Sequence, residues 1–127
     1  MPHFTLEFTD NIKQEANIPE LLKKANDILI SFKDVFPIGG IRSRAIEHSI
    51  YRIADGACDD AFVHAQLKIG SGRPEEIKKK VCETIFEMLK DHFSDLMDRR
   101  YMALSLEIIE FSESGTYKHN TIHRRFK

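Results

Sequence analysis

The chain begins with Met1-Pro2-His3-Phe4-Thr5-Leu6-Glu7-Phe8, a stretch in which apolar and polar side chains alternate. Phe4, Leu6 and Phe8 fall on one side of that alternation, and a period of two indicates a β-strand with a single apolar face. Proline suits the first position of a strand, because it has no amide hydrogen to donate to a ladder. We therefore expect a strand that starts at the head of the chain and buries one face.

Pro2 also makes the head of this strand a candidate for chemistry. Proline is small enough for the initiator methionine to be trimmed, which would leave a secondary amine there. A model amino-terminal amine titrates near ~8, and burial beside cations lowers such a pKa. A neutral amine accepts a proton, so Pro2 is a candidate general base. If Met1 is retained, the Pro2 nitrogen is an amide and the pair is an ordinary start of a chain.

The composition describes a single domain over residues 1–127. Hydrophobic residues make up 42% and charged residues 31% of the chain, which is long enough to bury a core without metals or disulfides. A net charge of −1 gives no indication of a polyanionic partner. No signal peptide or membrane-length apolar run is expected. Cys58 and Cys82 lack the spacing of a metal or redox pair, so a cytoplasmic location is expected.

Apolar residues at helical spacing predict two amphipathic helices. The first covers residues 18–32, with Asn17 able to cap it, and ends before Phe36-Pro37. The second runs from Pro74 to about Arg99-Arg100 as one continuous element, with acidic residues in its first turn.

Alternating or β-branched residues predict three further strands. Residues 61–69 alternate most clearly, and residues 102–109 form the last strand. Residues 41–54 are expected to form one bent strand or two short ones before the turn at Asp55-Gly56. The polar tail, residues 112–127, includes Tyr117, Ile122 and Phe126, which predicts that it packs onto another part of the protein.

The order strand, helix, strand thus occurs twice, in halves of about 1–57 and 58–111 followed by the tail. Crossover connections of this kind make parallel pairs. Two βαβ units side by side predict an α+β fold, a four-stranded mixed sheet with two helices on one face. Nothing in the chain is left to cover the other face, so we infer a closed symmetric oligomer.

Three arginines are candidate anion-binding residues. Arg73 precedes Pro74 at the start of a helix, where the dipole disfavours a cation by up to ~1 kcal/mol unless an anion is held there. Arg42 and Arg44 are two apart on a strand and share a face, after Gly39-Gly40, which would let a ligand approach the backbone. The alternatives are a solvated Arg73 and an edge strand protected by arginines.

Taken together, these motifs resemble the 5-carboxymethyl-2-hydroxymuconate isomerase family of the tautomerase superfamily, whose members use an amino-terminal proline. The matching segments are Met1-Pro2-His3-Phe4, Phe36-Pro37-Ile38-Gly39-Gly40-Ile41-Arg42-Ser43-Arg44, Ala54-Asp55-Gly56, Ala61-Phe62-Val63-His64, Leu67-Lys68-Ile69-Gly70-Ser71-Gly72-Arg73, Tyr117-Lys118-His119-Asn120 and Phe126-Lys127. The Pro2 start is a weak signal alone, and the two arginine motifs at the right separation make it specific. Ser71, where a residue such as Ala is expected, and Arg124-Arg125 depart from the pattern.

The resemblance implies a tautomerase-like homotrimer with active sites near subunit contacts and no cofactor or metal. It implies isomerisation of 5-carboxymethyl-2-hydroxymuconate, a tricarboxylate of homoprotocatechuate breakdown, to its 2-oxo isomer. Pro2 would transfer the proton. Arg42 and Arg73 would bind carboxylates and stabilise charge on the 2-oxygen, and Arg44 would contribute to substrate binding.

Two other functions stay open on the residues alone. One is a tautomerase of another 2-hydroxydienoate or 2-oxo acid, and the other is a non-catalytic anion-binding oligomer that retains Met1. His119 and His123 have the i, i+4 spacing of a metal pair but no third ligand, so no metal site is expected. Nucleic acid is not expected as a partner, because the chain is not basic and lacks aromatic platforms. A membrane is not expected either, because no apolar run is long enough to span one.

Overall fold

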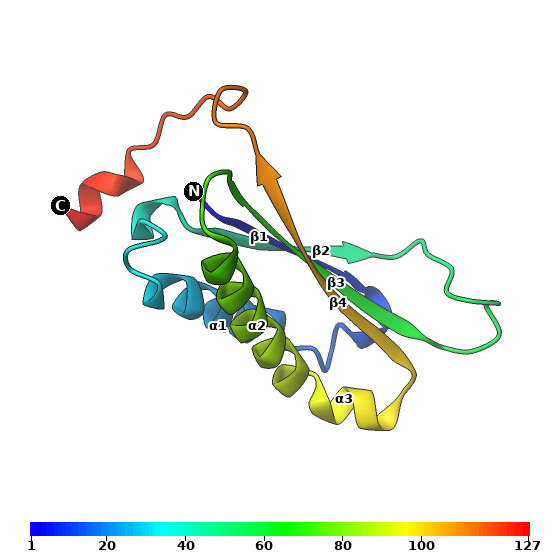
Figure 1. Ribbon diagram of the computed structural model, residues 1–127. Coiled ribbons are helices and arrows are strands. Elements are labelled where there is room, and N and C mark those ends of the chain that lie inside the picture. Colours follow the sequence, from blue (N-terminus) through cyan, green and yellow to red (C-terminus); the bar gives the residue numbers. More distant parts are fainter.

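The computed structural model describes residues 1–127 as a twisted sheet that lies over a layer of helices (Figure 1). In chain order the elements are β1 (His3–Thr9), η1 (Asp10–Ile12), α1 (Ile18–Ser31), η2 (Ile38–Gly40), β2 (Arg42–His48), β3 (Ala61–Gly70), α2 (Glu75–His92), α3 (Ser94–Arg99), β4 (Met102–Phe111) and η3 (Ile122–Phe126). The three η elements are short 3-10 helices. No helix combines the length and the apolar character needed to cross a bilayer.

The four strands form one mixed sheet in the order β2-β1-β3-β4. β1 runs parallel to β2, and β3 runs parallel to β4, as the two crossover connections require. The central pair, β1 and β3, is antiparallel. The predicted fold class is confirmed, and the strand that begins the chain is one of the two central strands.

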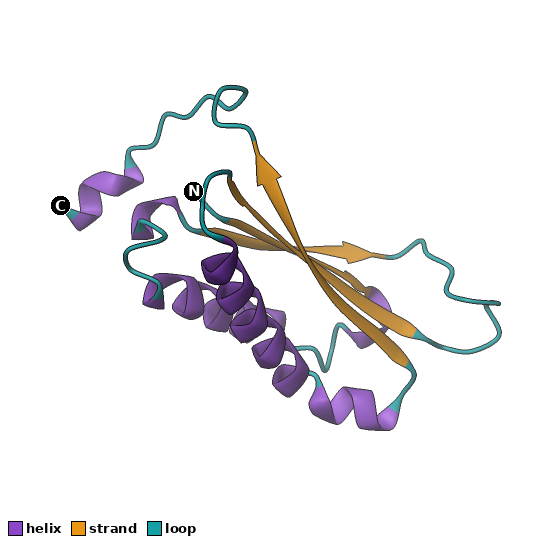
Figure 2. Ribbon diagram, in the orientation of Figure 1, coloured by secondary structure: helices purple, strands orange, loops and turns teal.

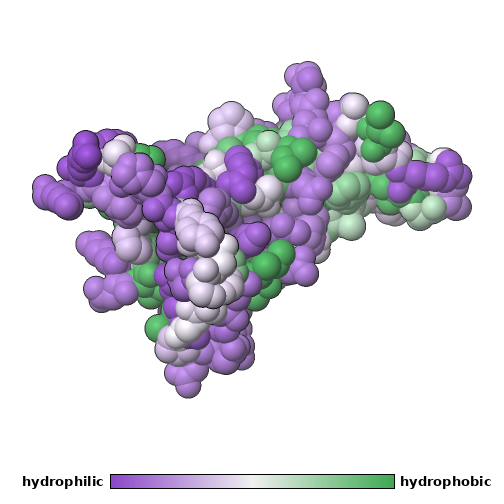
Figure 3. All heavy atoms as spheres, turned by 90° about the horizontal axis from the view of Figure 1, so that it is seen from above, coloured by the Kyte–Doolittle hydropathy of each residue, from purple (hydrophilic) through white to green (hydrophobic).

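The core lies between this sheet and the helices, which all cover the same face (Figure 2). Phe4 and Leu6 of β1 are fully buried, together with Leu67 of β3, Leu29 of α1 and Ile85 of α2. The opposite face of β1 carries its polar residues, because side chains alternate across a strand. The surface seen from above is mainly hydrophilic with separate hydrophobic groups (Figure 3).

The predicted strand over residues 41–54 is too long. β2 ends at His48, and residues 49–60 form an irregular connection that projects beyond the sheet (Figure 1). β2 is an edge strand whose only partner is β1, and the last pair joins Thr9 to His48. The β-branched residues beyond that pair favour a strand, but no neighbouring strand is there to pair with them, and they remain irregular.

The predicted second helix is also divided. It breaks at Phe93, which is fully buried and leaves the helical region with ψ near 9°. Beyond this break α3 buries Leu96, while Met97 beside it stays 40% exposed. Asn17 does occupy the cap of α1, but its side chain makes no capping hydrogen bond. Pro74 lies one residue before α2, at its N-cap rather than its first turn.

The tail returns from the end of β4 to the loop before β2 (Figure 1). The Asn120 side-chain amide donates a hydrogen bond to the Gly39 carbonyl over 2.9 Å. Ile122 and Phe126 are 42% and 44% exposed, and Tyr117 is 95% exposed. The tail does contact the protein through Asn120, but the prediction that its three apolar residues pack there is wrong.

Candidate active site

The head of the chain is held at the end of the sheet where β1 and β2 begin. Pro2 is buried and Met1 is partly buried. The Arg42 backbone amide donates to the Pro2 carbonyl over 3.1 Å, which continues the parallel ladder to the first residues of the chain. The pairing of His3 with Arg42 then places the side chains of β2 beside the start of β1. The sheet therefore fixes the position of Pro2.

Arg73 is fixed by contacts with two other segments. Its guanidinium donates to the Gly70 carbonyl over 3.0 Å and to the Val35 carbonyl over 3.1 Å. The same group lies over the Phe36 ring, 5.0 Å from the ring centre. Arg73 is therefore anchored rather than freely solvated, and the resolved contacts use backbone carbonyls and an aromatic ring instead of an anion.

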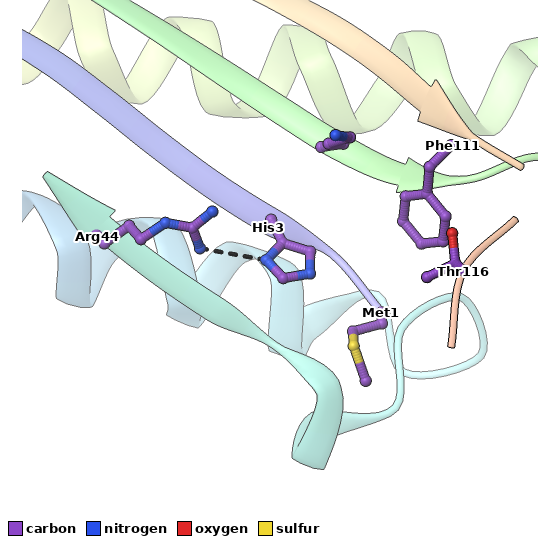
Figure 4. A pocket seen from close by; sticks show the side chains of 6 residues that line it. Met1, His3, Arg44, Phe111 and Thr116 are labelled. Carbon is purple, nitrogen blue, oxygen red and sulfur yellow. Dashed lines mark hydrogen bonds between the residues drawn. The ribbon is translucent and has the colours of Figure 1, made fainter. Parts of the chain in front are cut away.

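Arg42 and Arg44 do share a face of β2, as their spacing predicts. The Arg42 guanidinium lies 2.7 Å from the Met1 sulfur. The Arg44 guanidinium lies 3.2 Å from His3 Nδ1, which accepts its hydrogen bond (Figure 4). Arg42 thus contacts Met1 at the head of the chain, and Arg44, two residues further along β2, contacts His3.

The electrostatic field at this place favours a neutral amine. The pKa of the Met1 α-amino group is lowered from 8.0, first by burial and then by the positive charges of Arg73 and Lys118. The Glu113 carboxylate acts in the opposite direction and raises that pKa. The pKa of His3 is lowered from 6.5, first by burial and then by Arg44. Both groups therefore lie in surroundings that disfavour added positive charge.

Two pockets flank Met1. The smaller, of about 200 Å³, is lined by Met1, His3, Arg44, Lys68, Phe111 and Thr116 (Figure 4). The larger, of about 310 Å³, is lined by Met1, Pro37, Gly40, Lys118, Asn120 and His123. Because Met1 is the residue common to both linings, removing it would remove the wall between them. The cationic side chains of these linings are Arg44 and Lys68 in the smaller pocket and Lys118 in the larger one.

The sequence interpretation missed the contribution of the tail to this site. Glu113, Thr116 and Lys118 all reach the head of the chain, although more than a hundred residues separate them from it. No spacing rule connects such distant residues. The available signals were the apolar residues of the tail and its segment Tyr117-Lys118-His119-Asn120, which resembles the family.

The interpretation of Gly39-Gly40 also needs correction, because the protein itself makes the close approach. A side chain at Gly39 would begin 2.7 Å from His123 Nδ1 and 2.9 Å from its Cα. At Gly40 the nearest atom would be Met1 Cα, 3.4 Å away. His123 therefore packs against Gly39 and lines the larger pocket. No group of three or more His, Cys, Asp or Glu side chains is placed to hold a metal ion.

The arrangement of the strands defines a fold class. Two βαβ units share one mixed sheet, an arrangement that also occurs in solved structures of distant sequence. One solved structure with this fold is a W0 fused 4-OT wild-type symmetric trimer. It matches with a TM-score of 0.64 and 17% identity, over 92% of this chain and 93% of its own.

Within that class the sequence decides the family. The family model for 5-carboxymethyl-2-hydroxymuconate isomerase matches residues 2–126. A 5-carboxymethyl-2-hydroxymuconate Delta-isomerase of Escherichia coli is 44% identical over 127 residues, which are 100% of both chains. A crystal structure of a 5-carboxymethyl-2-hydroxymuconate isomerase from Deinococcus radiodurans R1 matches with a TM-score of 0.96 and 51% identity, over 99% of this chain and 94% of its own. The chain belongs to the 5-carboxymethyl-2-hydroxymuconate isomerase family, which confirms the resemblance of its motifs.

Proposed function

We propose that this protein is a cofactor-independent isomerase that converts 5-carboxymethyl-2-hydroxymuconate to its 2-oxo isomer in homoprotocatechuate breakdown. The observation that carries the proposal is the place of the chain head, where burial and the positive charges of Arg73, Lys118 and Arg42 lower the pKa of an amine. The family match over residues 2–126 and the names of the relatives at 44% and 51% identity support the substrate.

The reaction needs a base and a charge stabiliser. The Pro2 amine, freed by removal of Met1, takes the proton of the 2-hydroxyl group and returns it to a carbon of the conjugated chain. The oxygen becomes a carbonyl, the double bonds move, and no atom is gained or lost. Arg73 and Arg42 offset the negative charge that develops on the 2-oxygen and hold carboxylates, and Arg44 binds substrate beside them.

Removal of Met1 would move the free amine one residue further into the site. The next α-carbon lies about 3.8 Å further along the chain. Pro2 is buried whereas Met1 is only partly so, and the same cations surround both. The positive charges of Arg73, Lys118 and Arg42 would therefore lower the pKa of a Pro2 amine, as they lower that of the Met1 amine.

The assembly and location belong to the same proposal. A homotrimer is supported by a neighbour of this fold that is named a symmetric trimer and by the sheet face that no helix covers. A cytoplasmic location is supported by Cys58 and Cys82, which are both free thiols. Sedimentation equilibrium tests the assembly, because three chains of 14.7 kDa should sediment together.

The test is the pH dependence of isomerisation, followed by ultraviolet absorbance on protein whose mass shows that Met1 is absent. We expect kcat/KM to rise through one acid limb with a pKa below the ordinary 8.0 of an amino terminus. Pro2→Ala should lower kcat by about 100-fold or more, which is the usual contribution of a positioned base. Full turnover by a preparation whose mass includes Met1 would overturn the role of Pro2. Absence of turnover from folded protein with a free Pro2 would overturn the proposed substrate.

A further inference from the structure

Two charged residues of the tail reach the site without a role in the reaction as described. The Lys118 ammonium and the Glu113 carboxylate form an ion pair over 3.1 Å, which we call the tail pair. Lys118 also lies over the Phe111 ring, 5.9 Å from its centre. Both charges change the pKa of the amino group at the head of the chain: Lys118 lowers it and Glu113 raises it. The tail pair therefore lies within electrostatic reach of the reacting centre.

Glu113 occupies a place that suits a ligand carboxylate. Its carboxylate lies against Gly70, at the point where a side chain of that residue would begin. The Arg73 guanidinium lies 3.7 Å from the same point. The Glu113 carboxylate thus lies between Lys118 and the surroundings of Arg73. A bound anion at the same place would have both cations as neighbours. The free protein thus fills part of its own cationic site.

Lys118 has a second environment available. It lines the larger pocket beside Met1, together with Asn120 and His123, which can donate hydrogen bonds. The tail pair is weakly held, because its side chains are 36% and 54% exposed and water screens their attraction. A ligand that brings its own carboxylate into the pocket can replace Glu113 at little cost.

The substrate and the site divide in the same way. The tricarboxylate has a six-carbon backbone with a carboxylate at each end and a third carboxylate on a side arm. The two pockets meet at Met1, with Arg44 and Lys68 in the smaller one and Lys118 in the larger one. The two pockets therefore offer separate cations to carboxylates on different branches of the substrate.

We propose that Lys118 binds the carboxymethyl carboxylate of the substrate, and that Glu113 holds Lys118 in place until that carboxylate replaces it. This inference rests on the proposed isomerase activity and names the residue that selects a tricarboxylate. Lys118 is a specificity-determining residue. Glu113 is a positioning residue, because it acts through Lys118.

The experiment compares two substrates. One is 5-carboxymethyl-2-hydroxymuconate, and the other is 2-hydroxymuconate, which lacks only the side arm. Kinetics are measured on the pH plateau, where the amine is already neutral and shifts of its pKa have no effect. We expect Lys118→Met to raise KM for the tricarboxylate about tenfold and to leave KM for 2-hydroxymuconate within twofold. Glu113→Gln should lower KM for the tricarboxylate about threefold, since Lys118 then has no competing partner.

Two further variants separate binding from folding. Lys118→Arg keeps the charge and should restore KM to within about threefold of the original protein. Lys79→Met removes the lysine of a matched pair, 3.8 Å from Glu83 on the solvent side of α2, and should change neither substrate. Thermal unfolding of each variant shows whether the fold is kept.

The outcomes distinguish this inference from the function on which it rests. If the original protein turns over both substrates and Lys118→Met changes their kcat/KM by the same factor, the assignment of Lys118 is wrong and the isomerase stands. A rise of KM in Glu113→Gln would overturn the exchange between carboxylates. If the original protein turns over neither substrate, the proposed function fails, and the inference fails with it.

Discussion

Replacing Gly39 by alanine should detach the tail from the site while leaving the core folded. The new methyl carbon would begin 2.7 Å from His123 Nδ1, 2.9 Å from its Cα and 3.0 Å from its backbone nitrogen. Two of these atoms belong to the backbone, so a change of side-chain rotamer cannot remove the clash. η3 must move as a unit, and the Asn120 hydrogen bond to the Gly39 carbonyl moves with it.

The magnitude follows from what the tail loses. Forcing extra volume into a packed contact costs about 1–3 kcal/mol when the structure cannot move. Here η3 can move, because Ile122 and Phe126 are already 42% and 44% exposed. The loss is then one hydrogen bond, worth about 1 kcal/mol, and part of two apolar contacts. We expect the free energy of unfolding to fall by about 1–2 kcal/mol and Tm by roughly 3–8 °C.

The effect on function should be larger than the effect on stability. Lys118 lies two residues before Asn120, whose anchor to Gly39 is lost, so kcat/KM for the tricarboxylate should fall by about tenfold. Thermal unfolding followed by circular dichroism and steady-state kinetics measure the two effects. Gly115→Ala is the matched control, because its nearest neighbour would be 3.8 Å away in the same tail. If Gly39→Ala keeps both Tm within 1 °C and kcat/KM within twofold, the tail does not form a wall of the site.

Three other substitutions test the core, the cationic site and the start of β1. Leu6→Ala, at a fully buried position of β1, should lower the free energy of unfolding in urea by about 2–5 kcal/mol. Arg73→Ala should raise KM and move the acid limb of the pH profile to higher pH, because Arg73 is the charge that most lowers the amine pKa; an unmoved limb would contradict this. The lowered pKa of His3 means that the unfolded chain binds a proton below pH 6.5 that the folded chain resists. Stability should therefore fall as the pH falls through that range, and His3→Gln should make the fall shallower in urea titrations at each pH.

Local periodicity predicted most of the fold. The alternation in residues 1–8 identified β1 with its buried face. The apolar spacing of residues 18–32, and from Pro74 to about Arg99-Arg100, identified both long helices, although the second is divided into α2 and α3. Such patterns report which face of a segment is buried, and burial of one face is what the core imposes on each element. These patterns did not predict where an element ends when a neighbouring element sets its length. β2 stops because β1 stops, and α2 breaks because Phe93 turns into the core.

The sequence by itself determined the chemistry that is available at the site. It placed Pro2 behind the first residue, put Arg42 and Arg44 on one face of a strand, and put Arg73 at the start of a helix. These features depend on residue type and short spacing, which a chain fixes before it folds. The family motifs followed from the same residues.

Only the tertiary structure decided which of these groups meet. The mixed sheet brings the beginnings of β1 and β2 beside the end of β3, so that Pro2, Arg42 and Arg73 share one end of the molecule. The return of the tail adds Lys118 and Glu113, whose charges reach the chain head from the far end of the sequence. Contacts over such separations depend on the packing of every element between them. No local pattern carries that information, and therefore the composition of the site is a property of the fold.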